Sequence, residues 1–104
     1  MKRAIPRPQA RADLHAEIVY YRKQAGKLIA NQLAGAADDG LQHLQQNPGT
    51  GSPRIGQILE IPGLRSWRVS SFPLIWFYFE REDYLDVVRL LGERQDIMAI
   101  LDSN

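Results

Sequence analysis

The sequence predicts an α+β domain in which a helical hairpin packs on an antiparallel sheet, with the element order β-α-α-β-β-β and a short C-terminal helix. The first observation is the apolar run from Pro73 to Phe79, which is typical of a strand buried on both faces. The second is a pair of long stretches with helical periodicity, separated by almost no linker, that precede this run. The third is a strand-like stretch on either side of it. We therefore expect residues 1–104 to form a single domain.

The composition excludes several classes of protein. Cysteine is absent, so neither a disulfide framework nor a thiolate metal site or nucleophile is available. The apolar run is too short to cross a membrane and the N-terminus has no secretory apolar region, so we expect a cytoplasmic protein without membrane contacts. The net charge of +1 does not indicate sequence-specific nucleic-acid binding by the chain alone. We expect neither a cofactor nor a metal.

The N-terminal segment from Lys2 to Arg7 is predicted to be an edge strand, because Pro6 and Pro8 cannot donate to a ladder. Four basic residues precede the first acidic one, Asp13, and they indicate either a local basic surface or a solvated strand. These basic residues are Lys2, Arg3, Arg7 and Arg11.

Two helices follow, the first from Pro8 to about Ala25 and the second from about Lys27 to Gln46. Pro8 suits the first position of a helix, and Gly26 suits the residue after its end. Because the connection is so short, the helices should form an antiparallel hairpin. The second helix has small residues in the middle of its apolar stripe, which let a neighbouring element approach closely.

Residues 47–63 are predicted to be an irregular connection, because Asn47 to Pro53 has the composition of a loop and Pro62-Gly63 closes it. Ile58, Leu59 and Ile61 are the expected apolar anchors, and a functional role for the connection remains the alternative.

The rest of the chain is predicted to be a β-meander followed by one or two helical turns. The meander pairs Leu64–Phe72 with Leu74–Phe79 and then with Tyr84–Leu91. Residues Arg94 to Leu101 place apolar side chains at helical spacing, so this segment should fold back on the sheet.

Motifs along nearly the whole chain resemble the ParE branch of the RelE/ParE toxins of bacterial toxin–antitoxin modules, also known as plasmid stabilisation proteins. They are Ala12-Asp13-Leu14 with Ile18 and Tyr20-Tyr21, Gln45 to Gly49, Ile61-Pro62-Gly63-Leu64-Arg65, the apolar strand with Tyr78, and Leu90-Leu91-Gly92-Glu93-Arg94-Gln95-Asp96-Ile97. The resemblance implies the β-α-α-β-β-β fold and a toxin that is held inactive by a cognate ParD-like antitoxin. It also implies one of two targets, since the RelE branch cleaves messenger RNA on the ribosome and the ParE branch poisons DNA gyrase without chemistry of its own.

The residues favour the gyrase inhibitor over the ribonuclease. RNA cleavage needs an acid–base pair and cations for the developing charge. The apolar strand carries no arginine, lysine or histidine, and Gly92 stands where many relatives have histidine. His15 and His43 lie on the predicted helices. We therefore expect no catalytic residues; a nuclease would have to use Arg65, Arg68, Glu93 and Arg94. A binding remnant without toxicity is a third reading.

Two sets of binding residues are expected. For the target, the candidates are Arg65, Trp67, Arg68, Arg94 and Asp96, since cationic and aromatic groups are enriched at binding hot spots. The alternatives are that Trp67 packs in the core, that the two arginines beside it are solvated, and that Arg94 and Asp96 pair with each other or anchor the tail. For the antitoxin, the resemblance implies a groove where the hairpin meets the sheet edge, with candidates Tyr20, Tyr21, Leu28 and Trp76.

Overall fold

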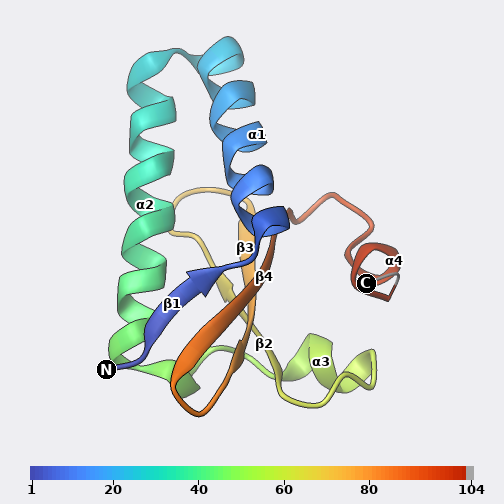
Figure 1. Cartoon of the computed structure of the whole chain (residues 1–104). Coiled ribbons are helices and arrows are strands. Elements are labelled where there is room, and N and C mark those ends of the chain that lie inside the picture. Colours follow the sequence, from blue (N-terminus) through green and yellow to red (C-terminus); the bar gives the residue numbers. More distant parts are fainter. Residues whose placement is uncertain (103–104) are drawn as a thin grey trace.

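The computed structural model describes residues 1–102 of the chain and confirms the predicted order of elements (Figure 1). The elements are β1 (Arg3–Pro6), α1 (Pro8–Ala25), α2 (Lys27–Gln46), the 3-10 turn η1 (Pro48–Thr50), α3 (Arg54–Ile58), β2 (Leu64–Arg68), β3 (Leu74–Glu80), β4 (Tyr84–Gly92) and α4 (Ile97–Asp102). Gly26 joins the two long helices with a φ of 94°, a conformation that glycine adopts without strain.

The four strands form one sheet in the order β1-β4-β3-β2. Strands β2, β3 and β4 are the predicted antiparallel meander, whereas β1 pairs with β4 in parallel. The predicted antiparallel sheet is confirmed for these three strands, and the parallel strand β1 extends it at one edge. The long connection through the helical hairpin allows the parallel pairing, which a tight turn could not make. The edge position predicted for β1 is confirmed, and its proline at Pro6 is tolerated there.

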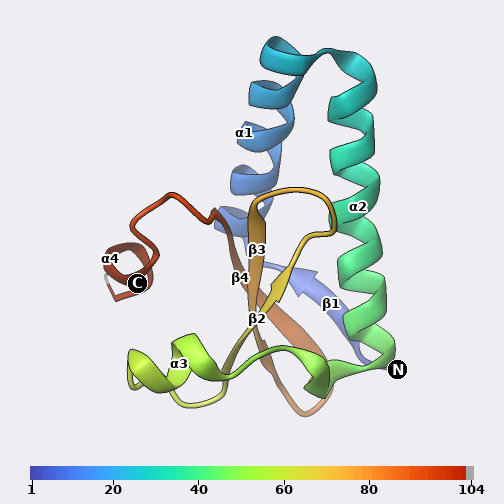
Figure 2. The same cartoon turned by 180° about the vertical axis from the view of Figure 1, so that it is seen from behind.

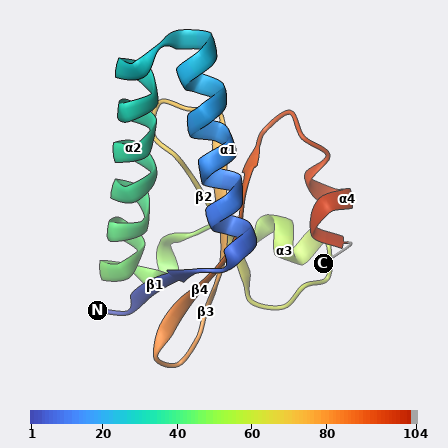
Figure 3. The same ribbon diagram turned by 45° about the horizontal axis from the view of Figure 1, so that its top comes forward.

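Strand β3 is buried on both faces, as the sequence predicts. Trp76 and Tyr78 lie in a core cluster that includes residues of α1 and α2. Phe77 points to the other face, into a second cluster with residues of α3 and α4 such as Leu101. Figure 3 shows the hairpin on one side of the sheet and α3 and α4 on the other. The sheet is thus the middle layer of three.

Apart from shifts of one residue at the ends of strands, three segments differ from those predicted. The connection expected to be irregular contains η1 and α3, in which Ile55 and Leu59 pack toward the sheet while Ile58 is 57% exposed, so Ile58 is not an anchor. Strand β2 ends at Arg68 because the chain turns before β3, and Phe72 in this turn packs in the core. The C-terminal helix starts at Ile97, three residues later than predicted.

An ion pair fastens α1 to the sheet. The Arg89 guanidinium on β4 donates to both carboxylate oxygens of Asp13, at 2.8 and 3.0 Å, and the Leu90 backbone N–H donates to the same carboxylate. Both charged side chains are largely buried, at 15% and 10% exposed. The pair therefore connects elements that lie far apart in the sequence, with its hydrogen bonds largely shielded from water.

Glu17 lies one turn further along α1, beside this ion pair. Its Oε2 atom is buried and accepts no hydrogen bond from any described residue. Burial raises the pKa of the Glu17 carboxyl above its ordinary value, and the charge of Asp13 raises it further. Ionised Glu17 is therefore destabilising.

We predict that Glu17→Gln raises the free energy of unfolding at pH 7, by about 1 kcal/mol, because the amide carries no charge into this site. A raised native pKa means that the penalty is absent below the unfolded pKa and grows as pH rises through the native pKa. Urea unfolding at pH 7 and at about pH 4 should therefore show the advantage at the higher pH only. Glu82→Gln, in the exposed β3–β4 turn, is the control. An advantage that persists unchanged in acid would contradict this assignment.

Candidate functional site

An open groove of about 800 Å³ runs between helix α2 and the edge of the sheet at β2. We call it the α2–β2 groove, and Figure 2 shows the β2–β3 turn beside α2 at this place. Helix α2 contributes Ile29, Gln32, Gly35, Ala36, Asp39, Gly40 and His43, and the sheet side contributes Trp67, Arg68, Ser70, Ser71 and Phe72. The predicted groove at the junction of hairpin and sheet edge is therefore present, with a largely apolar surface and polar groups around it.

Three small residues, Gly35, Ala36 and Gly40, form part of the helical wall of the groove. Gly40 lets two indoles approach the helix, since a Cβ atom there would lie 3.4 Å from Trp67 and 3.6 Å from Trp76. Gly35 is different, because a Cβ atom at that position would have no neighbour within 4 Å. The stripe of small residues thus packs on the sheet at one end and leaves space at the other.

Trp67 is half-buried and forms the sheet wall of the groove together with Phe72. The imidazole of His43 stacks on the Trp67 indole, with ring centroids 4.5 Å apart and an interplanar angle of 20°. The His43 Nε2 atom lies 3.3 Å from the Thr50 hydroxyl, which further orients the ring. A preset pair of flat rings thus lines the groove.

The four residues expected to contact an antitoxin do not line the α2–β2 groove. Trp76 is only 1% exposed, and its indole N–H donates to the Ala37 carbonyl at 3.1 Å, so the structure places it in the core. Tyr21 is half-buried and meets Phe72 edge to face at 5.4 Å. Tyr20 and Leu28 are exposed, at 56% and 70%, but neither lines the groove. Core packing is thus the role that the geometry supports for Trp76.

Arg65 is held by the loop before β2. Its Nη1 group donates to the carbonyls of Gly49 and Gly51 at 3.2 and 2.7 Å. The Tyr78 hydroxyl donates to the Pro48 carbonyl at 2.7 Å and accepts from the Gly51 N–H at 3.0 Å. Burial raises the pKa of the Tyr78 phenol, so the hydroxyl stays protonated. Arg65 and Tyr78 together fasten the loop to the sheet, which leaves the solvated alternative for Arg65 unsupported.

The other charged candidates surround the end of β4. Arg68 forms an ion pair with Glu93, and both side chains are exposed. Asp96 caps the start of α4, because its Oδ1 accepts from the Ala99 N–H. Arg94 is exposed and makes no hydrogen bond or ion pair with another described residue. The structure thus brings Arg68 and Glu93 together, while Arg65 is engaged with the loop.

Neither histidine completes an acid–base pair with these groups. His43 faces Trp67 and Thr50, and His15 is exposed on α1. Within residues 1–102, no group of three or more histidine, aspartate or glutamate side chains is arranged to hold a metal ion. None of the helices in this part of the chain is long and apolar enough to cross a membrane.

Comparison with protein families gives a match over nearly the whole chain. The sequence profile described as "ParE toxin of type II toxin-antitoxin system, parDE" matches residues 5–97. The chain belongs to the ParE toxin family. The resemblance in the motifs is thereby confirmed, and membership implies a cognate antitoxin as partner.

A solved structure has the same fold as this ParE-family chain. It is the "Chromosomal ParDE TA system from P. aeruginosa", which superposes with a TM-score of 0.75 at 23% sequence identity. The match covers 88% of this chain and 96% of the other. At this identity the similarity establishes the fold alone. No curated protein sequence gives a significant match.

Sequence reasoning missed several residues of the groove in this ParE-family chain. The sequence placed His43 on a helix without assigning it to a groove, and it predicted that Phe72 ends a strand. The signal was present in part, since Gly35 and Ala36 marked a helix face without bulk. The pattern did not show which portion of that face the sheet leaves uncovered.

We predict that Gly51→Ala destabilises the fold by about 2 kcal/mol or more, because a Cβ atom would lie 2.3 Å from the buried Tyr78 hydroxyl and would break its contact with the loop. Gly49→Ala is the matched control, since a Cβ atom there has no neighbour within 4 Å. Thermal and urea unfolding of both variants measure the difference. Equal stability of the two variants would show that Tyr78 does not hold this loop.

Proposed function

We propose that this ParE-family chain inhibits DNA gyrase and that its antitoxin inserts an amphipathic segment into the α2–β2 groove. The observation that carries the second part is the groove itself, with its aromatic wall and a helical wall that leaves open space at Gly35. The choice of target rests on the family and on the surroundings of the charged residues.

The groove suits the apolar face of an amphipathic helix or extended segment. Trp67 and Phe72 offer flat apolar surface, and Gly35 leaves room for a side chain of the partner. Asp39 and Arg68, which also line the groove, can orient the polar side of the segment. A segment that folds on binding would gain from such a preformed surface, because the toxin has little to reorganise.

Binding to gyrase is favoured over RNA cleavage because the candidate catalytic groups are engaged in other contacts or buried. Arg65 donates to loop carbonyls, and Arg68 is paired with Glu93. Along β3, Trp76, Phe77 and Tyr78 are buried, so the middle of the sheet offers no accessible acid or base. The exposed Arg94 is the best remaining target-binding candidate, since it has no intramolecular partner among the described residues.

We predict that the purified chain inhibits supercoiling by DNA gyrase and stabilises gyrase-linked breaks. Arg94→Ala should weaken inhibition about fivefold or more while leaving the melting temperature unchanged, because an exposed cation at an interface contributes to binding and not to folding. Arg22→Ala, at the exposed end of α1, is the control and should retain full inhibition.

Expression without antitoxin separates the alternatives. Induction of the DNA-damage response supports the gyrase target. Rapid loss of translation with intact DNA, together with transcript cleavage that disappears in Glu93→Ala, would instead establish a ribonuclease. Harmless expression of the folded chain would identify a binding remnant.

We predict that Gly35→Leu abolishes neutralisation by the antitoxin while gyrase inhibition persists. The new side chain has open space around the helix and therefore fills the groove without disturbing the core, and replacing glycine within a helix stabilises the helix by up to about 1 kcal/mol. The affinity of the purified antitoxin should fall at least tenfold, measured by calorimetry.

Asn31→Leu is the matched control, because Asn31 is exposed on the same helix but does not line the groove. It should leave antitoxin affinity unchanged. Equal affinity for Gly35→Leu would place the antitoxin elsewhere on the chain without affecting the gyrase assignment.

A further inference from the structure

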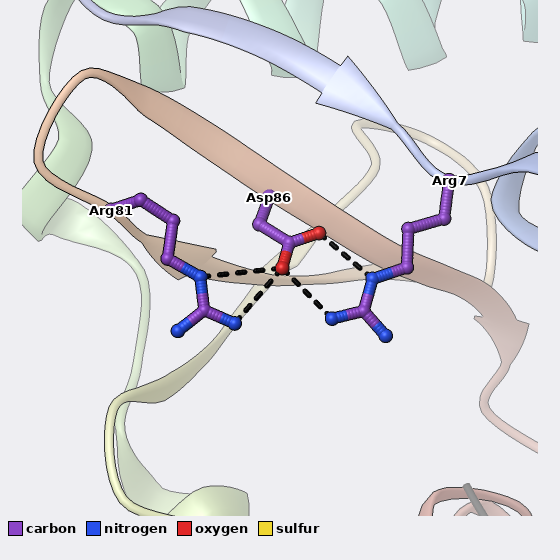
Figure 4. Close-up of polar contacts among 3 residues, drawn as sticks. All are labelled: Arg7, Arg81 and Asp86. Carbon is purple, nitrogen blue, oxygen red and sulfur yellow. Dashed lines mark hydrogen bonds and ion pairs between the residues drawn. The ribbon is translucent and has the colours of Figure 1, made fainter.

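A buried carboxylate holds two arginines on the face of the sheet opposite the helical hairpin. Asp86, on β4, is 7% exposed. Arg7 donates to its two oxygens from Nε and Nη2 at 2.9 and 2.8 Å. Arg81 donates to Oδ2 from Nε and Nη2 at 3.3 and 2.9 Å. Figure 4 shows the two guanidinium groups reaching the carboxylate from opposite sides.

This trio carries an excess of positive charge and of hydrogen-bond donors. The hydrogen bond from Arg7 does most to lower the pKa of Asp86, and Arg81 adds to it against the opposing effect of burial, so the carboxylate is ionised at neutral pH. One negative charge thus faces two positive ones. Each guanidinium has five N–H donors and uses two of them on Asp86. The arginine side chains remain 45% and 43% exposed, so the other donors are accessible.

Both arginines line a pocket of about 260 Å³ whose remaining lining residues are apolar. Its other walls come from five segments of the chain, namely Ile61 before β2, Leu64 on β2, Phe79 on β3, Val88 on β4 and Leu101 on α4. The Arg81 guanidinium lies 4.5 Å from the centroid of the Phe79 ring, which holds it at the pocket mouth. Cationic donors and an apolar cavity are therefore side by side.

We propose that the Arg7–Asp86–Arg81 trio and this pocket form a docking site for an acidic protein segment that carries a large apolar residue next to a carboxylate. The apolar side chain fills the pocket, and the carboxylate accepts from the free N–H groups of both arginines. Asp86 acts as a positioning residue, because it fixes both guanidinium groups before the partner arrives and so reduces the ordering cost of binding.

A short acidic peptide fits this site better than a nucleic acid does. Glu82 and Asp83 directly follow Arg81 in the β3–β4 turn, so a polyanion would meet repulsion there. A single carboxylate needs only the two arginines, and the cavity accommodates one apolar side chain. The site is separate from the α2–β2 groove, with which it shares no lining residue. It does not depend on the proposed antitoxin contact or on the gyrase target.

The test uses the full chain and two probes that differ by one group. The probes are N-acetyl-leucyl-glutamyl amide and N-acetyl-leucyl-glutaminyl amide. Their binding is followed by NMR, through the Nε–Hε signals of Arg7 and Arg81 and the methyl signals of Val88 and Leu101. The glutamyl probe should shift these signals saturably, and the glutaminyl probe should bind about tenfold more weakly, as expected for the loss of charge-assisted hydrogen bonds.

Variants locate the binding. Arg81→Gln should weaken binding of the glutamyl probe about fivefold to tenfold. Arg81→Lys keeps the positive charge but loses the paired N–H donors of the guanidinium, so its affinity for the probe should be intermediate. Arg54→Gln, on the exposed side of α3, should have no effect. If a variant fails to fold, the difference in affinity between the two probes on the unaltered chain tests the proposal by itself.

Three results would overturn the proposal. The first is the absence of saturable shifts at the arginines and the pocket methyl groups. The second is equal affinity for the two probes, which would reduce the site to apolar contact. The third is tighter binding of a short DNA duplex or of inorganic phosphate at the same arginines, which would make it a phosphate site.

Discussion

The structure depends on the burial of β3 on both faces. A strand whose side chains are apolar in either direction is stable only as the middle layer of three, because each face must be removed from water. The helical hairpin covers the face with Trp76 and Tyr78, and α3 with α4 covers the face with Phe77. The rest of the chain is therefore arranged around one requirement, and the two covering layers differ greatly in size.

Polar contacts, several of them partly buried, hold these layers in register. Asp13 and Arg89 fasten α1 to β4, Asp86 holds both Arg7 and Arg81, and Arg65 anchors the loop that leads into β2. Each contact joins segments that the chain brings together only on folding. Since directional hydrogen bonds add specificity to nondirectional apolar packing, these contacts determine where each covering layer lies on the sheet.

The same arrangement places the surfaces available for binding at the margins of the sheet. The long hairpin leaves the α2–β2 groove at the sheet edge, and the short helices on the other face leave the smaller pocket beside the two arginines. The middle of the sheet is occupied by aromatic packing. A ParE-family chain built in this way has its hollows at the margins of the sheet and a buried aromatic centre.

The sequence by itself determined the fold class, the order of the elements and the family, because periodicity, prolines, glycines and local motifs are properties of neighbouring residues. It did not determine which tryptophan reaches the surface. Trp67 and Trp76 are directly paired on adjacent strands, yet Trp76 is buried under α2 while Trp67 lines the groove. That difference follows from the strand order and from the place where α2 crosses the sheet edge. Likewise, only the folded chain brings Arg65 to the loop carbonyls and Arg7 to Asp86, since these contacts depend on the relative positions of segments that no local pattern encodes.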